Sequence, residues 1–157
     1  MATDPLRYRV MQNVQTTLAA IAERDGYHYT IPPGSVYLEP VDLLQQPSSK
    51  LPVLIVAPDD RQTERVFLQQ RIRSVFRMLI TGIVEAEGSD PGRKLAAAER
   101  LYSDIEKALR VDLSRGGLTS ATRVFEPDPP FLGLGSQLRV IIQQPIDCWI
   151  QRDYGSP

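Results

Sequence analysis

His28 and Cys148 are the one histidine and the one cysteine in the 157-residue sequence, and these side-chain types are suited to proton transfer and nucleophilic attack. No serine or cysteine lies in a recognisable nucleophile setting that His28 could activate as a general base. Cys148 alternates with apolar residues, where a thiol packs as a small apolar group. We expect His28 to be a surface or half-buried strand residue and Cys148 to lie in the core. A small enzyme built on His28 and a carboxylate is a remote alternative.

Two further stretches of the sequence partly match patterns that bind phosphate groups or metal ions. Residues 88–95 (GSDPGRKL) sit between a predicted strand and a predicted helix, but a phosphate-binding loop needs four residues between its glycines, then Lys and a hydroxyl. The acidic turns at 59–60 and 85–90 could attract a divalent ion, although such carboxylates are usually solvated. One Cys and one His cannot complete a structural zinc site or an internal disulfide. The sequence therefore predicts no cofactor and no metal.

A run of arginines interleaved with aromatic residues suggests a charged surface. It consists of Arg65, Arg71, Arg73 and Arg77, with Phe67 and Phe76 between them. The whole chain balances 18 Lys and Arg against 19 Asp and Glu, which removes the broad basic field of general nucleic-acid binding. Salt bridges at a protein interface are the favoured interpretation, and direct DNA binding is the weaker one.

Composition indicates one globular domain over residues 1–157. Hydrophobic residues make up 42% and charged residues 24%, which is enough apolar material for a core. The first residues, MATDPLRYRV, do not have the pattern of a signal peptide, and no apolar stretch approaches the ~20 residues that cross a bilayer. We expect a soluble cytoplasmic protein with no membrane partner.

Two stretches have the apolar spacing of amphipathic helices. The first follows the helix-start pair Asp4-Pro5 and is predicted to end near Asp25, with Gly26 as its cap. The second follows Asp90-Pro91 and is predicted to run to about Val111. The apolar positions recur three and four residues apart: Leu6, Val10, Val14, Leu18 and Ile21, then Leu95, Ala98, Leu101, Ile105, Ala108 and Leu109. Each helix therefore has one face for a core.

The remaining apolar stretches predict strands. Residues 51–57 (LPVLIVA) have the pattern of a central strand covered on both faces. Residues 62–85 predict two strands or one long bent strand, although periodicity alone also allows a helix. Short extended pieces are expected over 27–44, and further strands over 119–125 and 138–151, where Pro145 predicts an edge position, bulge or kink. The result is an α+β fold: a mostly antiparallel sheet with two amphipathic helices packed on one face.

The order of these elements, with several short stretches, resembles the tail terminator (tail-completion) proteins of tailed bacteriophages. The stretches are LPVLIVAPDD, FRMLITGIVEAEG, LAAAERLYSDIEKALRVD and RVIIQQPIDCWIQRDYG, together with Asp25-Gly26-Tyr27 and Gly116-Gly117-Leu118. The resemblance implies a structural virion protein, assembled in the host cytoplasm, that forms a homo-hexameric ring on the head-proximal end of the tail tube. Such a ring stops tube polymerisation and joins a head-completion or stopper protein, while the genome passes through its lumen without specific binding. Another neck component, such as a stopper, is the alternative.

This role requires interfaces rather than an active site. Loops 86–93 and 126–135 are rich in Gly and Pro and flank the longest strands, so we expect them to contact neighbouring subunits or the tail tube. The predicted interface residues come from the arginine run and from these two loops. They are Arg71, Arg73, Arg77, Asp90, Arg93, Pro129, Phe131 and Leu132.

Overall fold

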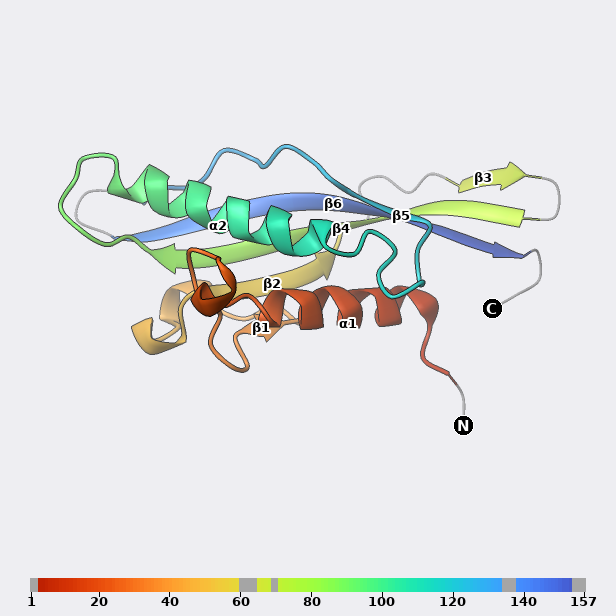
Figure 1. Cartoon of the computed structure of the whole chain (residues 1–157), viewed down its shortest axis with the longest axis horizontal. Coiled ribbons are helices and arrows are strands. Elements are labelled where there is room, and N and C mark those ends of the chain that lie inside the picture. Colours follow the sequence, from red (N-terminus) through yellow and green to blue (C-terminus); the bar gives the residue numbers. More distant parts are fainter. Residues whose placement is uncertain (1–2, 60–64, 69–70, 134–137, 154–157) are drawn as a thin grey trace.

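A computed structural model describes residues 3–59, 65–68, 71–133 and 138–153 and confirms the predicted α+β fold (Figure 1). The two helices are α1 (Leu6–Ala19) and α2 (Arg93–Arg110). The strands are β1 (Val36–Tyr37), β2 (Val53–Pro58), β3 (Arg65–Leu68), β4 (Arg71–Glu85), β5 (Ala121–Val124) and β6 (Arg139–Asp153). The segment 62–85 thus contains two strands where it is described, as expected, rather than a helix.

The six strands form one sheet in the order β1-β2-β4-β6-β5, and β3 pairs with β4 beyond the end of β2. Every pair is antiparallel except β1 with β2. The central pair is unbroken, from Arg71 opposite Asp153 to Glu85 opposite Arg139. β2 is an interior strand with Val53 to Val56 buried, which confirms the covered strand predicted from LPVLIVA.

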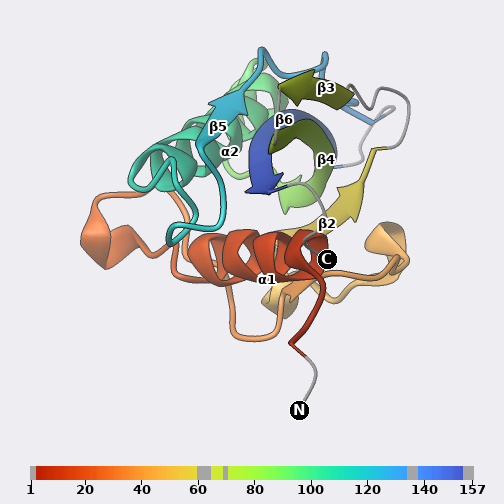
Figure 2. The same ribbon diagram turned by 90° about the vertical axis from the view of Figure 1, so that its right-hand side faces the viewer.

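Both helices pack on the same concave face of the curved sheet (Figure 2). From α1, Val10, Val14 and Leu18 are fully buried, and from α2, Leu101 and Ile105 are fully buried. They meet the inward side chains of β4 and β6, which alternate along each strand: Met78, Ile80, Val140, Ile142, Ile146, Cys148 and Ile150. Each fully buried aliphatic side chain contributes about 1.5–3 kcal/mol relative to exposure, so this face is the main source of stability.

At one end of the sheet, three strands continue past the helices (Figure 1). They are β3, residues 71–73 of β4 and residues 151–153 of β6, and they pair in register with one another. We call this three-stranded extension the arm. Loop 86–92 and the start of β6 lie at the opposite end of the sheet, so the subunit has two unlike ends.

The first helix is shorter than the sequence predicts. α1 ends at Ala19: the amides of Ala20 and Ile21 bond the carbonyls three residues back, and the Ile21 carbonyl accepts from the Ile31 amide (3.0 Å). The chain then passes through a 3₁₀ turn to Gly26, whose φ of 83° is that of a left-handed cap. The helix does begin directly after the Asp4-Pro5 pair, with Pro5 at the N-cap and no side-chain cap bond among the described residues.

The second helix begins at Arg93 and is close to its predicted length, with one error of burial. Leu95 was expected in the core but is 48% exposed. Residues 97, 98, 101, 104, 105 and 108 define the buried face, and Leu95 lies toward its edge in the first turn. After the helix, Arg115 (φ 51°) and Gly116-Gly117 turn the chain with positive φ angles.

Pro145 marks no bulge, and it lies just beyond the last pair of the β5–β6 ladder, Val124 with Ile146. It pairs opposite Leu79 in an unbroken register and lies between β4 and the chain following β5. Its carbonyl accepts from the Phe125 amide (3.2 Å), so its missing N–H faces the Phe125 carbonyl. The buried Gln144 side chain supplies that donor: its Nε2 lies 2.7 Å from the Phe125 oxygen and 3.0 Å from the Pro145 oxygen. A side-chain amide thereby replaces the absent ladder bond.

Candidate functional site: charged surfaces of the subunit

The predicted arginines of β4 lie on or beside the arm. Arg71 is opposite Asp153 in the strand register, and Arg73 is opposite Gln151. The Arg73 guanidinium stacks 4.3 Å from the Trp149 ring centre. Arg77 lies at the base of the arm, where its Nε and Nη2 bond the two oxygens of the buried Asp147 at 2.7 and 2.9 Å. The last pair is bidentate, which fixes the orientation of both side chains.

The predicted loop residues lie away from the arm. Asp90 is exposed at the far end of the sheet, where its carbonyl accepts from the Arg93 amide (3.1 Å). Arg93 opens α2 and reaches back to the Gly88 carbonyl (3.2 Å). These contacts give the 86–92 loop a defined shape and leave the Asp90 side chain in solvent.

Loop 126–135, in the residues that are described, runs along the outer edge of β6. The Asp128 amide donates to the Gln143 carbonyl (3.1 Å), and Phe131 and Ile141 exchange both backbone bonds at 2.9 Å. Phe131 is nevertheless 56% exposed, while Leu132 packs against the core. The segment therefore covers a sheet edge that would otherwise be open and presents an aromatic ring to solvent.

Between this segment and α2 lies a groove of about 460 Å³ that the sequence did not suggest. One wall carries Glu99, Glu106 and Arg110 of α2, and the other runs from Val124 to Pro130, including Pro129. Tyr102 joins the walls: its hydroxyl donates to the Asp128 carbonyl (2.7 Å) and lies 3.3 Å from the Gln143 amide, which donates to it. Burial raises the pKa of Tyr102, so this hydroxyl stays protonated as a donor.

The groove is acidic. Four carboxylates line it against one basic side chain, Arg110, which is already bonded to Glu106. Glu99, Glu126 and Asp128 are exposed and form no ion pair within the described part of the chain. We call this feature the acidic groove. The sequence shows only that Glu99 and Glu106 share one helix. Glu126 and Asp128 follow the next strand, and it is the fold that brings the two pairs together.

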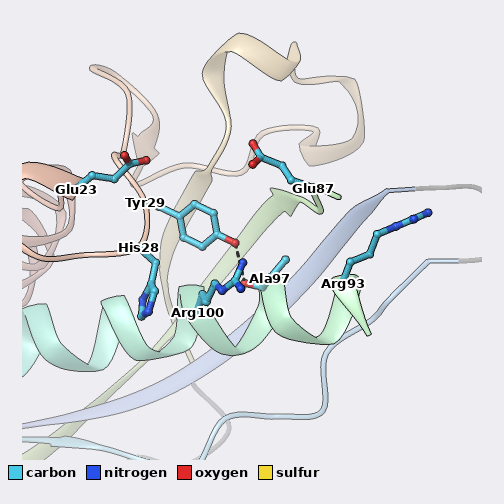
Figure 3. A pocket seen from close by; sticks show the side chains of 7 residues that line it. All are labelled: Glu23, His28, Tyr29, Glu87, Arg93, Ala97 and Arg100. Atoms are coloured by element: carbon cyan, nitrogen blue, oxygen red, sulfur yellow. Dashed lines mark hydrogen bonds between the residues drawn. The ribbon is translucent and has the colours of Figure 1, made fainter. Parts of the chain in front are cut away.

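His28 lies beside a second pocket, of about 330 Å³, lined by charged and aromatic side chains (Figure 3). It is in a loop rather than the expected strand, and its Nδ1 lies 2.9 Å from Oδ1 of the buried Asp104. The other pocket residues are Glu23, Tyr29, Glu87, Arg93, Ala97 and Arg100. A paired imidazole next to a pocket is a candidate general base.

The contacts of Asp104 favour a structural role for this pair. Its carboxylate also accepts from the backbone amides of His28 (3.0 Å) and Tyr29 (2.9 Å), which belong to the loop after α1. Lys107 fastens the same loop by donating to the Gly26 carbonyl (2.8 Å). Among the described residues, no group of three His, Cys, Asp or Glu side chains is arranged to hold a metal ion. The arrangement is a clamp between loop and helix.

No family model matches the chain, and no curated protein matches it either. Neither helix of the described structure combines the length and apolar character needed to cross a membrane.

Proposed function

We propose that this protein is a tail terminator of a tailed bacteriophage, a structural subunit that forms a homo-hexameric ring on the head-proximal end of the tail tube. The ring ends tube polymerisation and offers its other face to a head-completion or stopper protein. The proposal starts from the sequence resemblance and is supported by the shape and charge of the subunit.

The observation that carries it is that the subunit has two separated, unlike surfaces. The arm extends at one end of the sheet, and the loop 86–92 lies at the other. A closed ring of identical subunits needs two different surfaces that meet head to tail, whereas a twofold dimer needs only one self-complementary patch. An arm without a helical cover is suited to such a contact.

The net charge of the chain is compatible with a ring through which DNA passes. A net charge of -1 avoids the strongly basic lumen that would retain passing DNA. Arg77 is paired with Asp147 and stacked 5.0 Å from the Phe125 ring, so part of its charge is neutralised within the subunit.

Electron microscopy of particles from a phage that lacks this gene tests the proposal. We expect overlong or unjoined tails beside filled heads, with normal virions restored by the native gene in trans. Tails of normal length beside heads that leak DNA would instead identify a head-side stopper. Normal virions would exclude both neck functions.

The enzyme alternative is tested in the same system. If His28→Ala restores virions as well as the native gene does, catalysis by His28 is not required for assembly.

A further inference from the structure

We propose that the arm binds the arm of a second copy of this chain by strand addition. The outer edge of β6 in one subunit pairs with the outer edge of β3 in the next. The inference deepens the proposed ring and rests on it, because it assigns a junction between neighbouring subunits. The junction uses backbone groups alone, and their register is described for all three strands of the arm.

In the arm, β6 has an outer edge that no described strand covers. The Pro145 carbonyl accepts from the Phe125 amide, so the odd-numbered residues of β6 direct their backbone groups toward β5. The β5 ladder ends at Trp149. The next odd-numbered residues, Gln151 and Asp153, therefore direct their amides and carbonyls outward, and no strand among the described residues pairs with them there.

The other edge of the arm is open in the same way. The Arg77 carbonyl accepts from the Asp59 amide, so the odd-numbered residues of β4 direct their backbone groups toward β2 and β3. The even-numbered residues of β3 lie opposite them and bond β4. Arg65 and Phe67 therefore direct their amides and carbonyls away from β4, and no described strand pairs with that side of β3.

The two edges are suited to each other. Each offers the amides and carbonyls of two alternate residues, and one subunit cannot pair them itself because β4 lies between them. β3 and β6 both run antiparallel to β4, so in a sheet that repeats β3-β4-β6 from subunit to subunit the added β3 lies parallel to β6. Each contact leaves one edge of each subunit open for the next neighbour. The contact is therefore head to tail, and closing a ring pairs every edge.

The described part of the chain protects its other sheet edges and not those of the arm. The segment after β5 continues along β6 by bonding Gln143 and Ile141, and β1, at the far edge, is only two residues long. The arm extends past both helices (Figure 1). Unpaired backbone groups on such an edge are a template for another strand. A β3 from the next subunit gives β6 in the arm the partner that β5 gives it nearer the core.

Proline substitution at an outward amide tests this assignment. Proline removes one backbone donor, and an edge strand tolerates it where the N–H does not bond inside the sheet. Gln151→Pro blocks the β6 edge and Arg65→Pro blocks the β3 edge, while both leave the bonds to β4 in place. Gln151→Ala and Arg65→Ala are the matched controls, since each changes the same side chain and keeps the amide. Circular dichroism establishes that each variant is folded, and sedimentation velocity measures association of the full chain.

We expect the native chain and both alanine controls to associate beyond dimers. Each proline variant alone should associate at least about tenfold more weakly, because every junction then lacks one donor and leaves a carbonyl unpaired. An equimolar mixture of the two proline variants has one intact junction per pair of subunits. It should therefore form heterodimers and nothing larger.

Hydrogen exchange on the native chain gives a second measurement that needs no substitution. The amides of Phe67 and Gln151 donate to no strand in the single chain, so they should exchange at least about tenfold more slowly in the assembled protein than in the monomer. Unchanged exchange at both amides on assembly would overturn the proposed pairing.

The sedimentation results can also contradict the assignment. It fails if the native chain stays monomeric to millimolar concentration, or if folded proline variants associate as their alanine controls do. If Gln151→Pro alone abolished association, two β6 edges would instead pair about a twofold axis. None of these results decides the proposed function, which the gene-deletion phenotype tests independently.

Discussion

Gln144 performs a task that a backbone amide normally performs, and this can be measured. Its Nε2 donates to the carbonyls of Phe125 and Pro145, and the side chain is 2% exposed. Gln144→Leu leaves the Phe125 carbonyl without its donor, and we expect the free energy of unfolding to fall by about 1–3 kcal/mol. The neighbouring Gln143 is exposed, so Gln143→Leu is the matched control, with an expected change within about 0.5 kcal/mol. Equal effects in urea denaturation would refute this role.

Cys148 makes stability depend on pH in the alkaline range. Burial raises the pKa of its thiol from 9.0 to about 11. Between these values the unfolded chain releases the thiol proton while the folded chain keeps it, so stability is complete below pH 9 and falls as pH rises, by up to about 1.4 kcal/mol per pH unit. Cys148→Ala lacks this dependence. We therefore expect the stability advantage of the native chain over the variant to shrink from pH 8 to 10.5 in urea titrations under reducing conditions, and a constant difference would contradict the assignment.

Asp104 and His28 should contribute unequally. Asp104→Ala leaves the His28 and Tyr29 amides without their acceptor, and we expect a loss of about 1–3 kcal/mol in the free energy of unfolding. The His28 side chain is 50% exposed and its backbone bonds survive substitution, so His28→Ala should cost less than about 1 kcal/mol. Thermal denaturation of both variants decides this, and a larger effect of His28→Ala would reject the clamp.

At the level of elements, Gly82 allows β2, β4 and β6 to pack closely. A Cβ at this position would lie 2.6 Å from Leu54 Cδ2 and 3.2 Å from Ile142 Cγ1, and both residues are fully buried. We expect Gly82→Ala to destabilise the chain by about 1–3 kcal/mol through overpacking. Gly92→Ala, at the N-cap of α2, where an added Cβ meets nothing within 4 Å, is the control and should cost less than about 1 kcal/mol in the same denaturation experiment. A Gly82→Ala, Leu54→Ala double variant whose loss of unfolding free energy is smaller than the sum of the two single losses would identify the clash as the cause.

Elements were predictable where a local pattern determines them. The stripe of α1, the apolar run of β2 and the alternation of β6 gave correct element types because each buries one repeating set of side chains. The errors came from hydrogen bonds that apolar spacing does not show. The Ile31 amide bonds the Ile21 carbonyl just after the end of α1, and the Gln144 side chain supplies the donor that Pro145 lacks. Neither compensation is visible from local spacing.

For the candidate surfaces, too, local sequence patterns were visible and tertiary contacts were not. The arginines of β4 were visible as a run, and the Pro-rich segment was visible from its composition. The acidic groove was not, because its carboxylates come from α2 and from the segment after β5, and only the tertiary fold brings them together. The His28–Asp104 pair, 76 positions apart, was missed for the same reason.

For the whole molecule, we expect stability to be uneven along the central strands. Residues 78–84 of β4 lie under the helices, whereas residues 71–73 lie in the arm, which the helices do not cover. Amides of the arm should exchange with solvent at least about tenfold faster than those of residues 78–84, because they open without global unfolding. Native-state hydrogen exchange on the monomer measures this. Uniform protection along β4 would mean that the arm unfolds only with the core.

The pairing of β4 with β6 also has a consequence for how the chain folds during synthesis. Arg77 and Asp147 are 70 positions apart, and the whole central ladder joins segments separated in this way. Until β6 leaves the ribosome, β4 has an apolar face and an open edge with no partner, and helix formation by α2 cannot supply the missing strand. Contacts between such distant segments slow folding and prolong the exposure of aggregation-prone surface. Nascent chains that stop before residue 139 should therefore depend on chaperones, because the core is incomplete until β6 has been made.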